Sequence, residues 1–179
     1  MTGYDDPAFF GDRWAYLYDE GLFEAPAMEN GPTVDFLADL AGAPAGGGRV
    51  LELAIGTGRI GLPLAARGLA VEGVEASAAM VDRLRAKPGG DNLTSSQRQE
   101  DTFRNVARVL EPGGAFVIEC FVPNPAAFTQ GQRVSVLNVS EDAATIELAG
   151  LRLTERYADW GRAPFGADSR GHVSVYRPA

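Results

Sequence analysis

Cysteine and histidine are almost missing from this chain of 179 residues, which has one of each, Cys120 and His172. A single cysteine excludes a disulfide within the chain and suits a reducing compartment. One histidine and one cysteine cannot form a His/Cys zinc site, and no clustered carboxylate spacing points to another metal, so we expect none. Cys120 stands in an apolar run, where we expect a buried and inert thiol.

Long apolar runs and positive charge are also scarce. No stretch could span a bilayer, and the first residues lack the pattern of a signal peptide, so we expect a cytoplasmic protein without a membrane partner. The net charge of −8 and the pI near 4.7 argue against a nucleic-acid partner. The length and the apolar content of 45% favour a single domain over residues 1–179.

What the sequence does contain is a strand–turn–helix pattern at residues 50–61, Val-Leu-Glu-Leu-Ala-Ile-Gly-Thr-Gly-Arg-Ile-Gly. The apolar run 50–55 predicts a buried parallel strand. Gly56 and Gly58 permit a turn with positive φ, which a ligand can approach closely, and we expect a helix to begin near Gly58. A strand, a glycine turn and a helix N-terminus together predict a nucleotide or cofactor pocket.

The kind of cofactor depends on Glu52. Residues 56–61 also match the G-x-G-x-x-G fingerprint of dinucleotide-binding proteins. A carboxylate shortly before Gly56 would repel a pyrophosphate but would suit a cationic amine. The stretch resembles the first motif of class I S-adenosylmethionine-dependent methyltransferases, an acidic residue followed by alternating small residues. Ala54 stands where that motif more often has a glycine. The resemblance implies S-adenosylmethionine as cofactor and S-adenosylhomocysteine as product.

A second carboxylate, Glu75, ends the next predicted strand, 70–75. Its distance from Gly58 is close to the spacing at which an acid on the second strand of a βαβ unit reaches ribose hydroxyls. Ser77 then predicts the N-cap of a helix. We expect that helix to turn three apolar side chains inward: Met80, Val81 and Leu84.

A further motif, Leu110-Glu-Pro-Gly-Gly114, ends a predicted helix at 100–110 and leads into an apolar strand at 115–122. This step resembles the segment before the fifth strand of class I methyltransferases, and dehydrogenases do not share it. The amphipathic helix predicted at 7–20 resembles a lid in which a Tyr-Asp pair covers the cofactor, although plain packing is the simpler interpretation of Tyr18. The resemblance implies cofactor contacts from Tyr18, Glu52, Ala54, Gly56, Thr57, Gly58, Ile60, Glu75, Ala76 and Met80.

The fold that the resemblance implies is α/β, a Rossmann-like methyltransferase sandwich. Its sheet would be mostly parallel, with a C-terminal antiparallel hairpin and added antiparallel strands. We expect three parts: a helical lid and linker (1–48), a cofactor-binding core (49–122) and an antiparallel part (123–179). The antiparallel strands are predicted at 134–139, 145–148, 151–157 and 172–176.

One interval departs from the family's plan. Residues 87–99 contain no strand-like run, although a third and a fourth strand are due between the second strand and the strand at 115–122. We therefore predict that an internal segment is missing between Asp91 and Asn92. A second absence is predicted near 147–149, where a helix is due.

The function that the resemblance implies is in-line transfer of a methyl group to an oxygen, nitrogen or carbon of a small-molecule acceptor. No residue can be named as catalytic, and a structural role for His172 at a strand start is favoured over a general base. The alternatives are a truncated or non-catalytic cofactor-binding module and, less favoured, a nicotinamide-dependent oxidoreductase. We expect a monomer or a homodimer.

Overall fold

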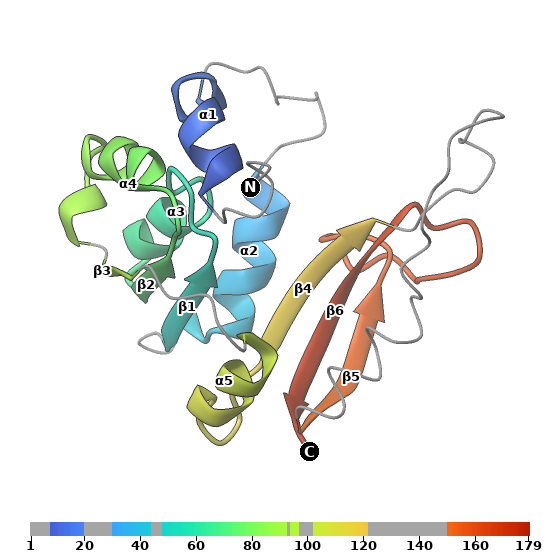
Figure 1. The fold of residues 1–179 in the computed structure, drawn as a ribbon. Coiled ribbons are helices and arrows are strands. Elements are labelled where there is room, and N and C mark those ends of the chain that lie inside the picture. Colours follow the sequence, from blue (N-terminus) through green and yellow to red (C-terminus); the bar gives the residue numbers. More distant parts are fainter. Residues whose placement is uncertain (1–7, 20–29, 44–47, 93, 97–101, 122–149) are drawn as a thin grey trace, which may run out of the picture. The chain divides into compact units, whose positions relative to one another are not determined.

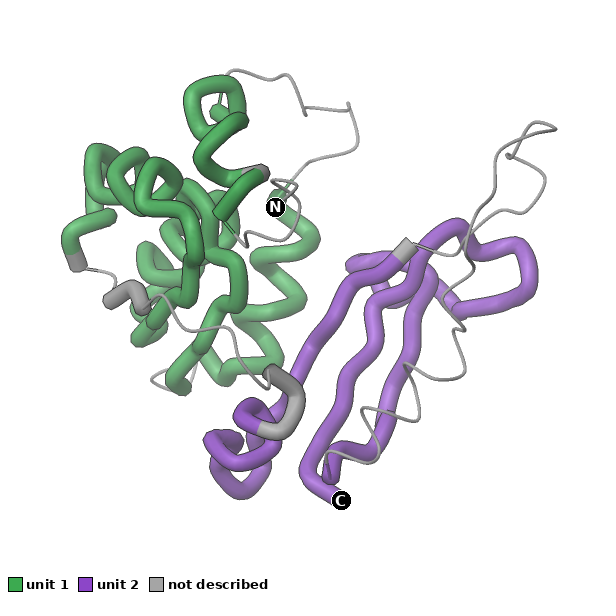
Figure 2. Tube along the Cα trace, viewed as in Figure 1, with its two compact units in different colours: residues 1–100 green, residues 101–179 purple. Residues whose placement is uncertain are grey.

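The structure is a computed structural model that describes residues 8–19, 30–43, 48–92, 94–96, 102–121 and 150–179. The chain forms two compact units, residues 1–100 and residues 101–179 (Figure 2). Each unit has its own three-stranded sheet. The predicted α/β class is confirmed, and the single domain over 1–179 stays a prediction. In the described part of the chain, no helix is both long and apolar enough to cross a membrane.

Unit 1 is a parallel sheet with helices packed against it (Figure 1). The strand order is β1-β2-β3, and both strand pairs are parallel. The predicted strands at 50–55 and 70–75 are confirmed in position as β1 and β2. The expectation that the first of them is buried is wrong, because Leu51 and Leu53 of β1 are exposed among the described residues. In chain order, the elements are α1 (Phe9–Tyr18), α2 (Asn30–Leu40), β1 (Arg49–Leu53), α3 (Gly61–Ala66), β2 (Ala70–Val74), α4 (Ala78–Arg85), a 3-10 helix (Gly90–Asn92) and β3 (Thr94–Ser96).

The core of unit 1 lies where α2, α3 and α4 meet the strands. Leu64 of α3 and Leu84 of α4 are each 1% exposed, and both belong to one hydrophobic core cluster. Val71 of β2 belongs to the same cluster. Ile55 joins this cluster from the turn that follows β1, so the glycine turn is fixed to the core at its first residue. Apolar positions that predicted the helices and β2 thus lie in the core, whereas Leu51 and Leu53 of β1 do not.

The expectation that 87–99 contains no strand is wrong. β3 (Thr94–Ser96) pairs in parallel with Glu72–Val74 of β2. Its residues are polar and few, so the strand depends on backbone pairing with β2 and not on an apolar pattern. The predicted join between Asp91 and Asn92 falls inside the 3-10 helix, and the missing segment stays a prediction. No described strand pairs with β1 on the edge opposite β2.

In its described residues, unit 2 is an antiparallel sheet with one helix packed against it. Its elements are α5 (Thr102–Val109), β4 (Phe116–Phe121), β5 (Leu151–Tyr157) and β6 (Gly171–Pro178). β6 lies between the other two strands and is antiparallel to both, so β4 and β5 run in the same direction. Val106 of α5 packs with Leu151 and Tyr176, which are almost fully buried. The strands predicted at 134–139 and 145–148 lie outside the described residues.

Helix α1 packs closely on the beginning of α4 (Figure 1). Ser77 is the N-cap of α4, as predicted, and its hydroxyl oxygen accepts from the Met80 amide at 3.2 Å. The same hydroxyl donates to the Asp12 carboxylate of α1 at 2.6 Å. A Cβ at Gly11 would lie 2.4 Å from the Cβ of Ser77, so the contact requires a residue without a side chain there.

This packing gives a stability prediction for Gly11→Ala. Alanine in an exposed helix usually stabilises by roughly 0.5–1 kcal/mol over glycine. At Gly11 the added methyl meets Ser77, so we expect a loss of about 1–3 kcal/mol in the free energy of unfolding. Gly31→Ala in α2 is the matched control, because a Cβ there meets nothing within 4 Å. Urea denaturation measures both. An equal gain for both variants would contradict the packing of α1 on α4.

Candidate functional site

The turn between β1 and α3 has three residues in the left-handed region. The φ values are 58° at Ala54, 56° at Gly56 and 84° at Gly58. Among the described residues, a Cβ at Gly56 would have only the Ala54 carbonyl within 4 Å, at 3.9 Å, so they leave room for a ligand at this position. A Cβ at Gly58 would lie 2.4 Å from Leu84 Cδ1 and 2.9 Å from Leu62 Cγ. Gly58 therefore serves the packing of the turn against α4, and Gly56 is the position that a ligand can approach.

Glu75 is a buried carboxylate directly after β2, 8% exposed. One of its oxygens accepts from the Gly56 amide at 2.9 Å, and the other accepts from the Ser77 amide at 2.9 Å. It thus joins the glycine turn to the start of α4. Each carboxylate oxygen has two lone pairs, so each can accept one further hydrogen bond. A ligand hydroxyl at this place would find two acceptor oxygens.

Glu52 is the second carboxylate, and its environment is different. Its Oε2 is shielded from solvent and has no hydrogen-bond partner in the described part of the chain. Burial raises the pKa of Glu52 to about 7, while the charge of Arg59 and the backbone amide of Gly61 act in the opposite direction. Gly61 gives the carboxylate room, because a Cβ there would lie 2.8 Å from Oε2. Glu52 is therefore a partly protonated acid that would gain from a cationic partner.

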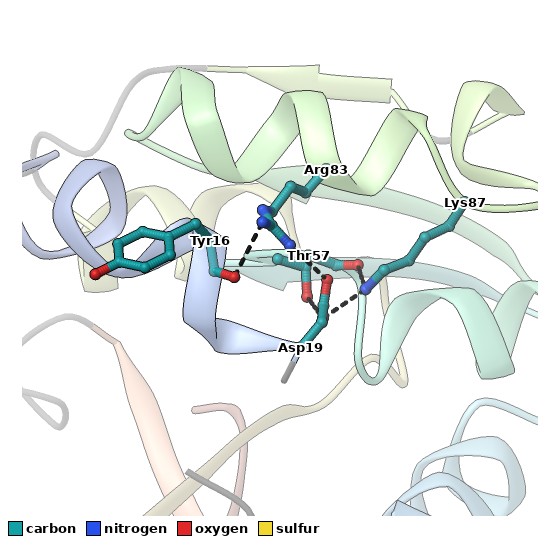
Figure 3. A network of polar contacts seen from close by, with 5 residues as sticks. All are labelled: Tyr16, Asp19, Thr57, Arg83 and Lys87. Atoms are coloured by element: carbon teal, nitrogen blue, oxygen red, sulfur yellow. Dashed lines mark hydrogen bonds and ion pairs between the residues drawn. The ribbon is translucent and has the colours of Figure 1, made fainter. Parts of the chain in front are cut away.

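Asp19, at the end of α1, connects that helix to the turn and to α4 (Figure 3). Its Oδ1 accepts from the Thr57 hydroxyl and from Lys87 Nζ, both at 2.7 Å. Arg83 lies 3.8 Å from the other oxygen and also donates to the Tyr16 carbonyl at 3.0 Å. Burial acts to raise the pKa of Asp19, but hydrogen bonds from Lys87 and Thr57 and the nearby positive charges lower it overall.

The sequence-predicted site residues all lie in unit 1. Ala54 is exposed, and Tyr18, Glu52 and Ala76 are half-buried. Thr57 is fully buried, and its carbonyl accepts from Lys87 Nζ at 2.9 Å. The remaining predicted residues are also buried: Gly56, Gly58, Ile60, Glu75 and Met80.

Sequence reasoning missed the residues that hold α1 against the turn. They are Asp12, Asp19, Arg83 and Lys87. One signal could have found Lys87, which is the only lysine of the chain. Asp19 is the acidic member of the Tyr-Asp pair that had drawn attention to Tyr18. Neither clue predicts the contact between Asp19 and Lys87, because 68 positions separate these two residues in the chain.

The remaining candidates lie in unit 2. His172 is half-buried, and its Nδ1 lies 2.9 Å from the Ser174 hydroxyl. Burial, followed by the charge of Arg156, lowers the pKa of His172. Cys120 is half-buried, so the expectation of a fully buried thiol is wrong. Among the residues that the structure describes, no group of three or more His, Cys, Asp or Glu side chains could hold a metal ion.

The known proteins that this chain resembles are methyltransferases. No protein-family model matches the chain. A curated relative, the 23S rRNA (uracil(1939)-C(5))-methyltransferase RlmD of Halomonas elongata, is 40% identical over 68 residues, which are 38% of this chain and 14% of that protein. The match thus spans a small part of that relative's length.

Solved structures match over nearly the whole chain. The CcbJ methyltransferase from Streptomyces caelestis is 28% identical with a TM-score of 0.72, and the match covers 95% of this chain and 98% of that one. An S-adenosylmethionine-dependent methyltransferase from Clostridium acetobutylicum is 11% identical with a TM-score of 0.71, and 94% and 98% are covered. The chain therefore has the fold of class I S-adenosylmethionine-dependent methyltransferases.

Proposed function

We propose that the protein binds S-adenosylmethionine at the glycine turn of unit 1 and methylates a small-molecule acceptor. The observation that carries this proposal is the shielded Oε2 of Glu52, which has no partner in the described residues. A buried carboxylate is costly unless a hydrogen-bonding cation pairs with it. The ammonium group of the cofactor is such a cation. The open position at Gly56, close by in the chain, allows the ligand to approach the backbone.

The roles of the other residues follow from their geometry. We assign the ribose hydroxyls to Glu75, whose oxygens each keep one lone pair beyond their bonds to Gly56 and Ser77. Ala54 and Ala76 border the same turn with small side chains. The remaining predicted residues would form the walls of the site: Tyr18, Thr57, Gly58, Ile60 and Met80.

The cofactor, when bound, supplies an electrophilic methyl group on a sulfonium, which an oxygen, nitrogen or carbon of the acceptor can displace in line. The chain's own residues must hold the methyl donor and the acceptor atom in line and exclude water. Glu52 and Glu75 would fix the two ends of the donor, the amino acid and the ribose. A general base is required only if the acceptor loses a proton in the transition state.

Two other functions fit less well. A nicotinamide dinucleotide would bring its pyrophosphate to the turn that Glu52 borders, and like charges in a partly buried site repel. A non-catalytic module would bind the same cofactor, so it differs from an enzyme only in turnover with an acceptor.

A curated relative that acts on rRNA raises the question of an RNA acceptor. The net charge of −8 favours a small molecule, since RNA binding requires a basic surface. We also propose a cytoplasmic location.

The first test is the pH dependence of cofactor binding. Calorimetry should show that S-adenosylhomocysteine binds and that NAD does not. Because the pKa of Glu52 is about 7, its carboxylate must ionise to accept the ammonium group. The affinity should therefore fall as the pH drops below 7, by about tenfold per pH unit once Glu52 is mostly protonated.

Glu52→Gln should remove this pH dependence and weaken binding at pH 8 by roughly 1–3 kcal/mol. Glu72→Gln is the matched control, because Glu72 is an exposed glutamate on β2 whose partner is Arg49. The control should bind like the wild type. Tight binding of NAD without S-adenosylhomocysteine would end the proposal. An unchanged pH profile in Glu52→Gln would remove Glu52 from the site.

The second test is the stability of the ligand-free protein. The pKa of Glu52 rises from 4.5 to about 7 on folding, so the folded state binds more protons between these values. The contribution of Glu52 is then fully present below pH 4.5 and is lost as the pH rises through 7. We expect the loss to be roughly 2–3 kcal/mol. Urea denaturation from pH 4.5 to 8 should show this slope in the wild type and in Glu72→Gln. A slope that persists in Glu52→Gln would show that another group causes it.

A further inference from the structure

We propose that Arg156 and His172 of unit 2 form a binding site for a carboxylate group. This site lies within unit 2 and does not depend on the proposed cofactor site of unit 1. β4 and β5 run in the same direction, so their carboxyl ends meet the beginning of β6 at one end of the sheet. Arg156 lies at the carboxyl end of β5, and His172 lies at the beginning of β6.

Arg156 is held in place but is not neutralised. Its Nε donates to the Ser174 hydroxyl oxygen at 2.9 Å, and its guanidinium carbon lies 5.5 Å from the centre of the Phe165 ring. These two contacts fix the plane of the guanidinium. In the described part of the chain, no carboxylate forms an ion pair with Arg156, and its two terminal nitrogens have no hydrogen-bond partner. A half-buried guanidinium with a free edge is a ready receptor for a planar anion.

The acidic residues around Arg156 are engaged elsewhere. Glu155, its neighbour on β5, accepts from the Tyr157 hydroxyl at 2.7 Å and lies 3.9 Å from Arg177. Glu119 of β4 accepts from the Trp160 ring at 2.9 Å. The free edge of Arg156 is therefore available to a ligand.

His172 adds a hydrogen-bond donor to this site. Ser174 is fully buried, and its oxygen already accepts from Arg156, so its own hydrogen must be donated to a nearby acceptor. That acceptor is Nδ1 of His172, 2.9 Å away. Its proton then lies on Nε2, which donates outward. The lowered pKa of His172 keeps the ring neutral near pH 7. His172 is therefore a donor to a ligand and not a general base.

The chemistry of the site favours a carboxylate over a phosphate. It offers one positive charge in a planar fork, one neutral N–H donor and an aromatic ring, Phe165, which packs edge-on against His172 at 5.8 Å. A planar monoanion on an apolar body matches these groups. A phosphate carries more charge and usually draws several cationic groups or backbone amides.

The test uses the only histidine of the chain as a reporter. The ring signals of His172 can be followed by NMR during titration with benzoate, at pH 7 and without cofactor. We expect saturable shifts and a rise in the pKa of His172 when benzoate binds, because a negative charge then lies beside the ring. Benzamide, which is similar in shape but neutral, should cause no saturable shift. Two-dimensional proton–nitrogen correlation spectra of the His172 ring should also show that the proton is on Nε2.

Arg156→Met should reduce the affinity for benzoate at least tenfold. Arg152→Met removes the same charge from the exposed part of the same strand and should bind benzoate like the wild type. A thermal melt establishes that each variant is folded. If Arg156→Met is not folded, Arg156→Lys is used in its place, because lysine keeps the charge but lacks the planar fork. The affinity of Arg156→Lys for benzoate should fall several-fold.

Three outcomes would overturn the proposal: no saturable shift in the wild type, an equal response to benzamide, or an undiminished response in the Arg156 variants. Binding of S-adenosylhomocysteine, measured on the same proteins, keeps the two proposals apart. It should be equal in the wild type and in Arg156→Met. If the wild type does not bind S-adenosylhomocysteine, the cofactor proposal fails and the benzoate result still decides the site in unit 2.

Discussion

The buried carboxylate of Glu75 is the contact on which the arrangement of unit 1 depends. It accepts the amides of Gly56 and Ser77, so a single side chain fixes the glycine turn and the first turn of α4 relative to β2. Ser77 in turn caps α4 and donates to Asp12, which ties α1 to the same point. An alanine at position 75 would leave two buried amides without partners, and each such group costs about 1–3 kcal/mol.

Glu52 shows the opposite use of a buried acid. Glu75 accepts from backbone donors, whereas the Oε2 of Glu52 is shielded and has no partner in the described part of the chain, and burial raises the pKa of Glu52 to about 7. Folding alone gives no reason for such an arrangement, because an apolar residue of similar size would avoid the cost of burial. Proteins accept costs of this kind mainly at functional sites. The two carboxylates thus differ in what folding uses them for: Glu75 fixes the turn through two backbone amides, whereas Oε2 of Glu52 has no such structural partner in the described residues.

The sequence predicted those parts of the fold that are encoded locally. The strand and turn around Gly56 and the cap at Ser77 were found because apolar runs, glycines and capping residues act within a few positions. Strand β3 was missed because Thr94–Ser96 has no apolar pattern and exists through its pairing with β2. The contact between Asp19 and Lys87 was missed because it joins residues far apart in the chain. The packing role of Gly58 likewise depends on Leu84, which only the fold brings near.

Electrostatics governs both proposed sites, each within its own unit. A methyl group leaves a sulfonium with dispersal of positive charge, so exclusion of water favours the transition state over separated, solvated reactants. Within unit 2, partial exclusion of water acts on Arg156 in a similar way. A half-buried guanidinium without an acidic partner in the described residues gains from an anion, because opposite charges attract more strongly at low dielectric. A carboxylate ligand would neutralise Arg156 and would be oriented by its planar fork.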